Sequence, residues 1–66
     1  MQVTINGRPH QLAGAASLAQ AVALLTSAPS GVAAAVNGAV VRRAAWEATT
    51  LAEGDDVEVL TAVQGG

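Results

Sequence analysis

The chain has 66 residues, of which 52% are hydrophobic and 12% charged, and its formal net charge is −2 at pH 7. A chain of this length forms one domain with a thin core, because a small domain buries only about 60% of the surface that its unfolded chain exposes. The acidic balance argues against nucleic-acid binding, which needs a basic face toward the phosphates.

The first predicted unit is a β-hairpin. Residues 2–5 alternate between polar and apolar side chains in the manner of a strand. Asn6-Gly7 follows, and both residues tolerate the positive φ that a tight hairpin turn requires. We expect residues 8–12 to form the return strand, at a sheet edge, because Pro9 lacks the N–H for a ladder hydrogen bond.

The next predicted element is a helix that begins at Ser17. Ser17 and Gln20 have the spacing of a capping box, in which each side chain hydrogen-bonds the free backbone N–H of the other residue. Residues 26–31, which contain a proline and a glycine, are expected to end the helix. Its predicted apolar face consists of Leu18, Ala21, Val22 and Leu25.

The apolar stretch 12–28 also resembles the core of a signal peptide. Cleavage near Ala28 would leave residues 29–66, which are too few to build a core without disulfides, and the chain has no cysteine. The stretch is also shorter than the roughly 20 apolar residues of a membrane span. We therefore expect a cytoplasmic protein with no membrane partner, since cysteine-free small domains are typical of reducing compartments.

A second hairpin is predicted in the second half of the chain. Residues 32–36 form a short apolar strand, Asn37-Gly38 repeats the hairpin signal, and residues 39–42 form the partner strand. Residues 43–52 are less regular and are expected to contain a short turn of helix. A tight turn at residues 53–55 leads into the last strand.

The last predicted strand covers residues 57–63 and is apolar on both faces, which is typical of a strand in the centre of a sheet. It is expected to lie parallel to the first strand, with the helix packed across the sheet. The predicted fold is therefore α+β, a β-grasp with a mixed sheet of four to five strands and one helix. The domain is expected to span residues 1–63, followed by a flexible tail over residues 64–66.

The predicted core depends on large side chains, because alanine adds little burial. Trp46, the only aromatic residue, is expected to fill the space under the second hairpin. The aliphatic members are expected to be Val3, Ile5, Leu12, Leu18, Val22, Leu25, Val36, Val57, Val59 and Val63.

A set of short motifs runs through the second half of the chain and ends on two glycines. They are V-N-G at 36–38, V-R-R at 41–43, Trp46, L-A-E-G-D-D-V-E-V at 51–59, and Gly65-Gly66. Together with the early I-N-G, they resemble the ThiS family, the ubiquitin-like sulfur carriers of thiamine biosynthesis. In the middle motif, the family often has proline before the arginine, whereas this chain has the pair Arg42-Arg43. This departure concerns the geometry of the local loop and not the assignment to the family.

The resemblance implies a sulfur carrier that is a substrate of its partner enzymes and not itself an enzyme. A ThiF-like adenylating enzyme would use ATP and magnesium to adenylate the carboxylate of Gly66. Sulfur from a donor such as a cysteine desulfurase would replace AMP to give a thiocarboxylate. A ThiG-like thiazole synthase would then take this sulfur into the thiazole ring. The chain itself would bind no cofactor and no metal, and would have no catalytic residue of its own.

The C-terminal end of the chain holds the candidate site residues. Gly66 is the modified terminus, and Gln64-Gly65 forms the tail that enters the partner's active site, where glycine allows close enclosure of the backbone. Glu58, Leu60 and Ala62 share one face of the last strand, opposite the valines, which are expected to face the helix. We interpret these three residues as a partner-binding patch, because apolar patches on an outer sheet face mark interfaces.

Two alternatives remain at this stage. One is the small subunit of molybdopterin synthase, a carrier that also ends in Gly-Gly and is usually longer. The other is a β-grasp binding module that does no acyl chemistry and does not need its tail. The acidic residues 53–58 are interpreted as a solvated turn, with docking against a basic partner as the alternative; their spacing matches no calcium loop.

Overall fold

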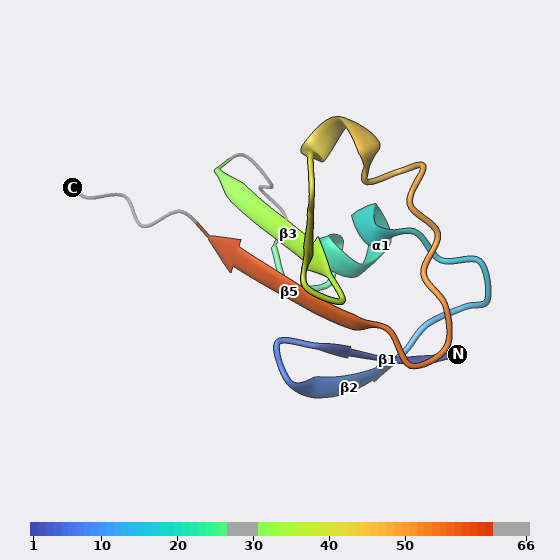
Figure 1. The fold of residues 1–66 in the computed structure, drawn as a ribbon. Helices are drawn as coiled ribbons and strands as arrows, with labels where there is room; N and C mark the ends of the chain where they lie inside the picture. The colour runs from blue at the N-terminus through green and yellow to red at the C-terminus, as the bar shows by residue number, and fades with distance from the viewer. Residues whose placement is uncertain (27–30, 62–66) are drawn as a thin grey trace.

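The structure is a computed structural model that describes residues 1–26 and 31–61 (Figure 1). Five strands, one α-helix and one short 3-10 helix make up the described part of the chain. The elements are β1 (Gln2–Ile5), β2 (Arg8–Gln11), α1 (Leu18–Ala23), β3 (Val32–Val36), β4 (Ala39–Val41), η1 (Arg43–Ala45) and β5 (Asp56–Thr61).

The strands form one mixed sheet in the order β2-β1-β5-β3-β4. The last strand, β5, lies in the middle, parallel to β1 and antiparallel to β3 (Figure 1). Its pairing with β3 runs from Val32↔Thr61 to Val36↔Val57. The predicted β-grasp fold and the central, parallel position of the last strand are thereby confirmed.

Both hairpins turn on their Asn-Gly pairs, as predicted. Asn6 and Asn37 have φ values of 52° and 51°, and the glycines that follow them have φ values of 81° and 85°. Two successive positive φ angles give the turn the twist that two-residue hairpins need. The proline-containing strand β2 lies at one edge of the sheet, as expected, and β4 lies at the other.

Helix α1 begins with the predicted capping box. The Gln20 N–H donates to Ser17 Oγ at 3.2 Å, and the Ser17 N–H donates to Gln20 Oε1 at 2.8 Å. The helix ends at Ala23, earlier than predicted, and Leu24 is its C-cap. The prediction that Leu25 lies on the buried face was wrong: its side chain is 44% exposed, because it follows the last helical turn and leaves the helical spacing.

The core lies between α1 and the inner face of the sheet. Trp46 is buried there, as predicted, and its indole Nε1–H donates to the Val41 carbonyl at 2.8 Å. Leu12 and Val36 are partly buried and pack against this core, and Val63 lies outside the described residues. The buried cluster consists of Val3, Ile5, Leu18, Ala21, Val22, Ala34, Trp46, Leu51, Val57 and Val59.

The turn before β5 is held by carboxylates. Asp55 accepts hydrogen bonds from the Ala52 N–H at 2.8 Å and from Asn37 Nδ2 at 3.0 Å. Glu53 accepts from the Gln2 N–H at 3.0 Å. These acidic residues are therefore bonded to the turn and to β1, which goes beyond the solvated turn that the sequence indicated. In the described ranges, no group of three or more acidic, histidine or cysteine residues is placed to hold a metal ion.

The predicted tail, residues 64–66, lies outside the described residues, so the predicted boundary between domain and tail stays a prediction. Within the ranges that the structure covers, no helix has the length and apolar character that a membrane span requires.

Candidate functional site

Strand β5 presents alternate side chains to opposite faces of the sheet. Val57 and Val59 are buried toward the helix, whereas Glu58 is exposed and Leu60 is 69% exposed. This confirms the predicted division of the strand for the residues that the structure describes. The other candidate site residues, Ala62, Gln64, Gly65 and Gly66, lie outside them.

Leu60 has apolar neighbours on the outer face of the sheet, from β3 and β4. Ala33 is its register partner on β3, and Ala35 pairs with both Glu58 and Val40. Val40 is 81% exposed. We call these five residues the outer patch.

The outer patch is hollowed. A depression of about 160 Å³ opens over β3, β4 and β5, where the small side chains of Ala33 and Ala35 lie among the larger Val40 and Leu60. Glu58 lines the same depression and adds a carboxylate. The apolar walls of the depression can accept an apolar side chain of a partner. The Glu58 carboxylate beside them can pair with a basic group of the same partner.

The sequence patterns indicated Glu58 and Leu60 but not their neighbours on β3 and β4. Val40 carried a weak signal, because it alternates with Val41 on a short strand. Val41 is half-buried toward the core, so Val40 must face outward. Ala33 and Ala35 carried no signal of their own, since alanine occurs on either face of a sheet.

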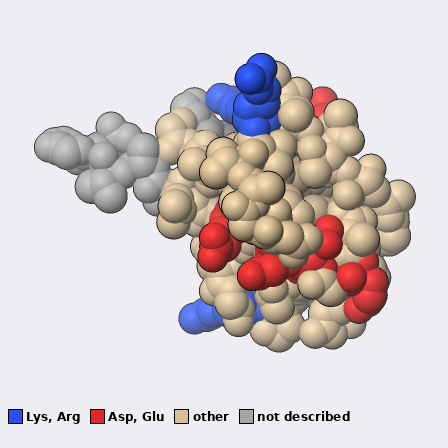
Figure 2. Space-filling view, in the orientation of Figure 1, with Lys and Arg blue, Asp and Glu red and all other residues tan. Residues whose placement is uncertain are grey.

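Charge is distributed unevenly over the surface. Figure 2 shows most of the visible acidic side chains in a band across the lower half of this face, with basic side chains at the upper edge and just below the band. In sequence, the basic residues are Arg8 on β2 and the pair Arg42-Arg43 at η1. The described surface therefore offers acidic groups over the central strand and the turn before it.

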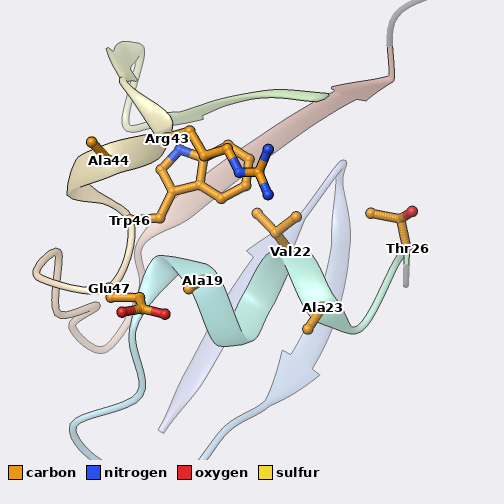
Figure 3. A pocket seen from close by; sticks show the side chains of 8 residues that line it. All are labelled: Ala19, Val22, Ala23, Thr26, Arg43, Ala44, Trp46 and Glu47. Carbon is orange, nitrogen blue, oxygen red and sulfur yellow. The ribbon is translucent and has the colours of Figure 1, made fainter. Parts of the chain in front are cut away.

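A larger pocket, of about 730 Å³, lies on the helix side of the molecule between α1 and residues 43–47 (Figure 3). The Trp46 indole and the Arg43 side chain lie along one wall, and α1 forms the other. Small residues of α1 leave this space open. The pocket is lined by Ala19, Val22, Ala23, Thr26, Arg43, Ala44, Trp46 and Glu47.

Comparison with known proteins decides the family. The model of the ThiS family matches residues 3–66. The chain belongs to the ThiS family. A search of curated proteins gives no match.

Two solved structures resemble this ThiS-family chain over its whole length. The crystal structure of the thiamine biosynthesis protein (ThiS) from Geobacter metallireducens is 36% identical, with a TM-score of 0.77 and full coverage of both chains. The solution structure of a thiamine biosynthesis protein from the same organism is also 36% identical, with a TM-score of 0.76 over all of this chain and 88% of that one. The predicted resemblance is thereby confirmed, and the chain is a member of a family of small β-grasp sulfur carriers.

Proposed function

We propose that this protein carries sulfur for thiamine biosynthesis on the carboxylate of Gly66. The observation that carries the proposal is the match to the ThiS family, which extends to the Gly65-Gly66 end of the chain. Both solved relatives are named as thiamine biosynthesis proteins. These names favour the thiamine pathway over the molybdopterin alternative, whose carriers share the Gly-Gly end.

The proposed chemistry starts from a carboxylate, which is a poor electrophile because its negative charge is delocalised. In the active site of a ThiF-like enzyme, a carboxylate oxygen of Gly66 attacks the α-phosphorus of magnesium-bound ATP, and pyrophosphate leaves. The outer sulfur of a persulfide on a donor such as a cysteine desulfurase attacks the resulting acyl adenylate, and AMP leaves. A further thiol then reduces the acyl disulfide that has formed, which gives the thiocarboxylate and leaves the two thiols joined as a disulfide. A ThiG-like thiazole synthase then takes sulfur from the thiocarboxylate. This chain supplies position, and the partners supply the catalytic groups and the nucleotide.

The position of β5 supports this role. The strand pairs with β1 on one side and with β3 on the other, and its valines are buried, so it is a firm base for the end of the chain. Five residues follow Thr61 in the sequence, and an extended segment of that length spans at most about 17 Å. The absence of Cβ atoms in Gly65-Gly66 permits a narrow entrance to the partner's active site.

We propose the outer patch as the surface on which the adenylating enzyme docks. Leu60 lies on the strand that leads to the tail, so a partner that covers it is also placed to receive the terminus. Val40 and Leu60 are both well exposed, and Ala62 would extend the patch along β5. Burial of a leucine side chain contributes about 1.5–3 kcal/mol, which is a substantial part of a transient interaction.

The first experiment measures the covalent state of the terminus. The protein is incubated with the adenylating enzyme, Mg-ATP, a cysteine desulfurase and cysteine, and is then weighed intact. We expect a mass increase equal to the replacement of one oxygen by sulfur, located in the C-terminal peptide. A variant without Gly65-Gly66 is the control and should gain nothing. If the partners are shown to be active and the wild-type protein still shows no mass change, the proposed carrier function is wrong.

The second experiment identifies the acceptor. Protein that bears the thiocarboxylate is offered in turn to thiazole synthase and to the large subunit of molybdopterin synthase. We expect thiazole synthase to take the sulfur. In cells, we expect this transfer to take place in the cytoplasm, as the cysteine-free sequence predicts. If the variant without Gly65-Gly66 keeps the protein's function in cells, the protein is a binding module and not a carrier.

A further inference from the structure

The side chain of Asn6 is hydrogen-bonded to the main chain of β5. Its Nδ2 donates to the Val59 carbonyl at 3.1 Å, and the Val59 N–H donates to its Oδ1 at 2.8 Å. The backbone N–H of Asn6 donates to the Val57 carbonyl at 2.9 Å. The carboxamide thus takes the place of one more residue of β1 in the parallel ladder.

This contact matters because β1 stops before β5 does. The two strands pair at Thr4↔Asp56 and Ile5↔Val57, after which the turn at Asn6 carries the chain away to β2. The positive φ of Asn6 lets the backbone turn while the side chain continues along β5. In the described structure, backbone pairing with β1 ends at Val57, and the Asn6 side chain continues the hydrogen bonds on this side of β5 to Val59, two residues closer to the tail.

Asn37 offers an internal comparison. It occupies the same position in the other Asn-Gly turn, is also exposed, and has a φ within 1° of that of Asn6 (51° against 52°). Its side chain is bonded to the opposite end of β5: Oδ1 accepts from the Asp56 N–H, and Nδ2 donates to Asp55 Oδ1, both at 3.0 Å. Two like residues therefore hold one strand, Asn37 at its first residue, Asp56, and Asn6 at Val59, two residues before its last residue.

We propose that Asn6 is a positioning residue for the sulfur-carrying tail, and this inference rests on the proposed function. Its side chain holds the backbone N–H and the backbone carbonyl of Val59. It thereby sets the direction in which the chain leaves β5 toward the partner's active site. The pairing Ala33↔Leu60 holds the other edge of β5 and is independent of Asn6. Loss of the carboxamide therefore leaves the strand end supported on one side, with the outer patch still in place.

The test compares Asn6→Gly with Asn37→Gly. Glycine accepts the positive φ of both turns, so each variant loses one exposed carboxamide and two hydrogen bonds without new backbone strain. We expect kcat for adenylation to fall about tenfold in Asn6→Gly, since misplacement of a reacting group by about 1 Å costs up to about a hundredfold. The Kd for the adenylating enzyme should remain unchanged in both variants, and kcat should remain unchanged in Asn37→Gly. Asn6→Asp keeps an acceptor for the Val59 N–H but places a carboxylate oxygen against the Val59 carbonyl in place of the donor, so kcat should also fall in this variant.

A second readout measures the strand directly and does not need the partner. NMR order parameters of the Leu60 and Thr61 amides should fall from about 0.85, the value of a rigid backbone, toward about 0.6 in Asn6→Gly but not in Asn37→Gly. Equal kcat values for the two glycine variants, or unchanged order parameters in Asn6→Gly, would overturn the inference. If the wild-type protein forms no adenylate, the proposed function is wrong, whereas the order parameters still decide whether Asn6 holds the strand end.

Discussion

At the scale of single residues, Trp46 combines packing with a hydrogen bond. The indole ring fills the core under the second hairpin, and its N–H donates to the Val41 carbonyl at the end of β4. A tryptophan is well placed where one edge of its ring can reach an acceptor, because a buried N–H without one is costly. In a core that contains no phenylalanine or tyrosine, this side chain has no equivalent.

Trp46→Phe should lower the free energy of unfolding by about 1–3 kcal/mol, because it removes the N–H donor and leaves part of the ring's space empty. Urea unfolding followed by circular dichroism measures the loss, since the substitution also removes the protein's tryptophan fluorescence. Val40→Thr, which keeps a β-branched residue at an exposed site, serves as the control and should change stability by less than about 0.5 kcal/mol. A Trp46→Phe variant as stable as the wild type would contradict this role of the indole.

At the scale of elements, α1 depends on its surroundings. A helix of six residues is far too short to be stable alone, because helix nucleation is costly. It persists here because Leu18, Ala21 and Val22 are buried against the sheet and because the capping box satisfies free N–H groups of its first turn.

Ser17→Ala should lower the free energy of unfolding by about 1 kcal/mol, since the N–H of Gln20 loses its side-chain acceptor. Ser17→Asp keeps an acceptor at the N-cap and should retain most of the stability. Urea unfolding of the three proteins under the same conditions makes the comparison. Equal stabilities of the Ala and Asp variants would show that the cap does not contribute.

At the scale of the whole molecule, the two faces of the sheet have separate roles. The inner face carries the core against α1, whereas the outer patch carries exposed apolar side chains around a shallow depression. Leu24, at the end of α1 on the helix side, is also exposed, to 55%, compared with 69% for Leu60. The molecule therefore contains exposed leucines on different sides, of which we propose that Leu60 contacts the partner.

Leu60→Asp should weaken binding to the adenylating enzyme at least tenfold, because burial of a leucine contributes about 1.5–3 kcal/mol and about 1.4 kcal/mol corresponds to a factor of ten in Kd. Leu24→Asp is the matched control and should bind as the wild type does. Isothermal titration calorimetry measures both affinities, and circular dichroism checks that both variants fold. A Leu60→Ala variant separates the loss of apolar surface from the added charge. If Leu60→Asp and Leu24→Asp bind equally well, the outer patch is not the docking surface.

Local chemistry made much of this fold predictable. The Asn-Gly turns, the capping box at Ser17 and the edge position of Pro9 follow from φ preferences and hydrogen bonds between near neighbours in the chain. The alternation of β5 also indicated which of its residues are buried and which are exposed. The Gly65-Gly66 end, together with the V-N-G and E-G-D-D-V-E-V motifs, was sufficient for the family.

The remaining features depend on contacts between residues far apart in the chain. The register of β3 against β5 places Ala33 and Ala35 beside Leu60, and only this register reveals the outer patch. Asn6 is 53 residues away from Val59 in sequence, so its hydrogen bonds to β5 exist only because β1 and β5 pair in parallel. Turns and caps are set by the energies of neighbouring residues, whereas register and burial are set by the packing of the whole sheet.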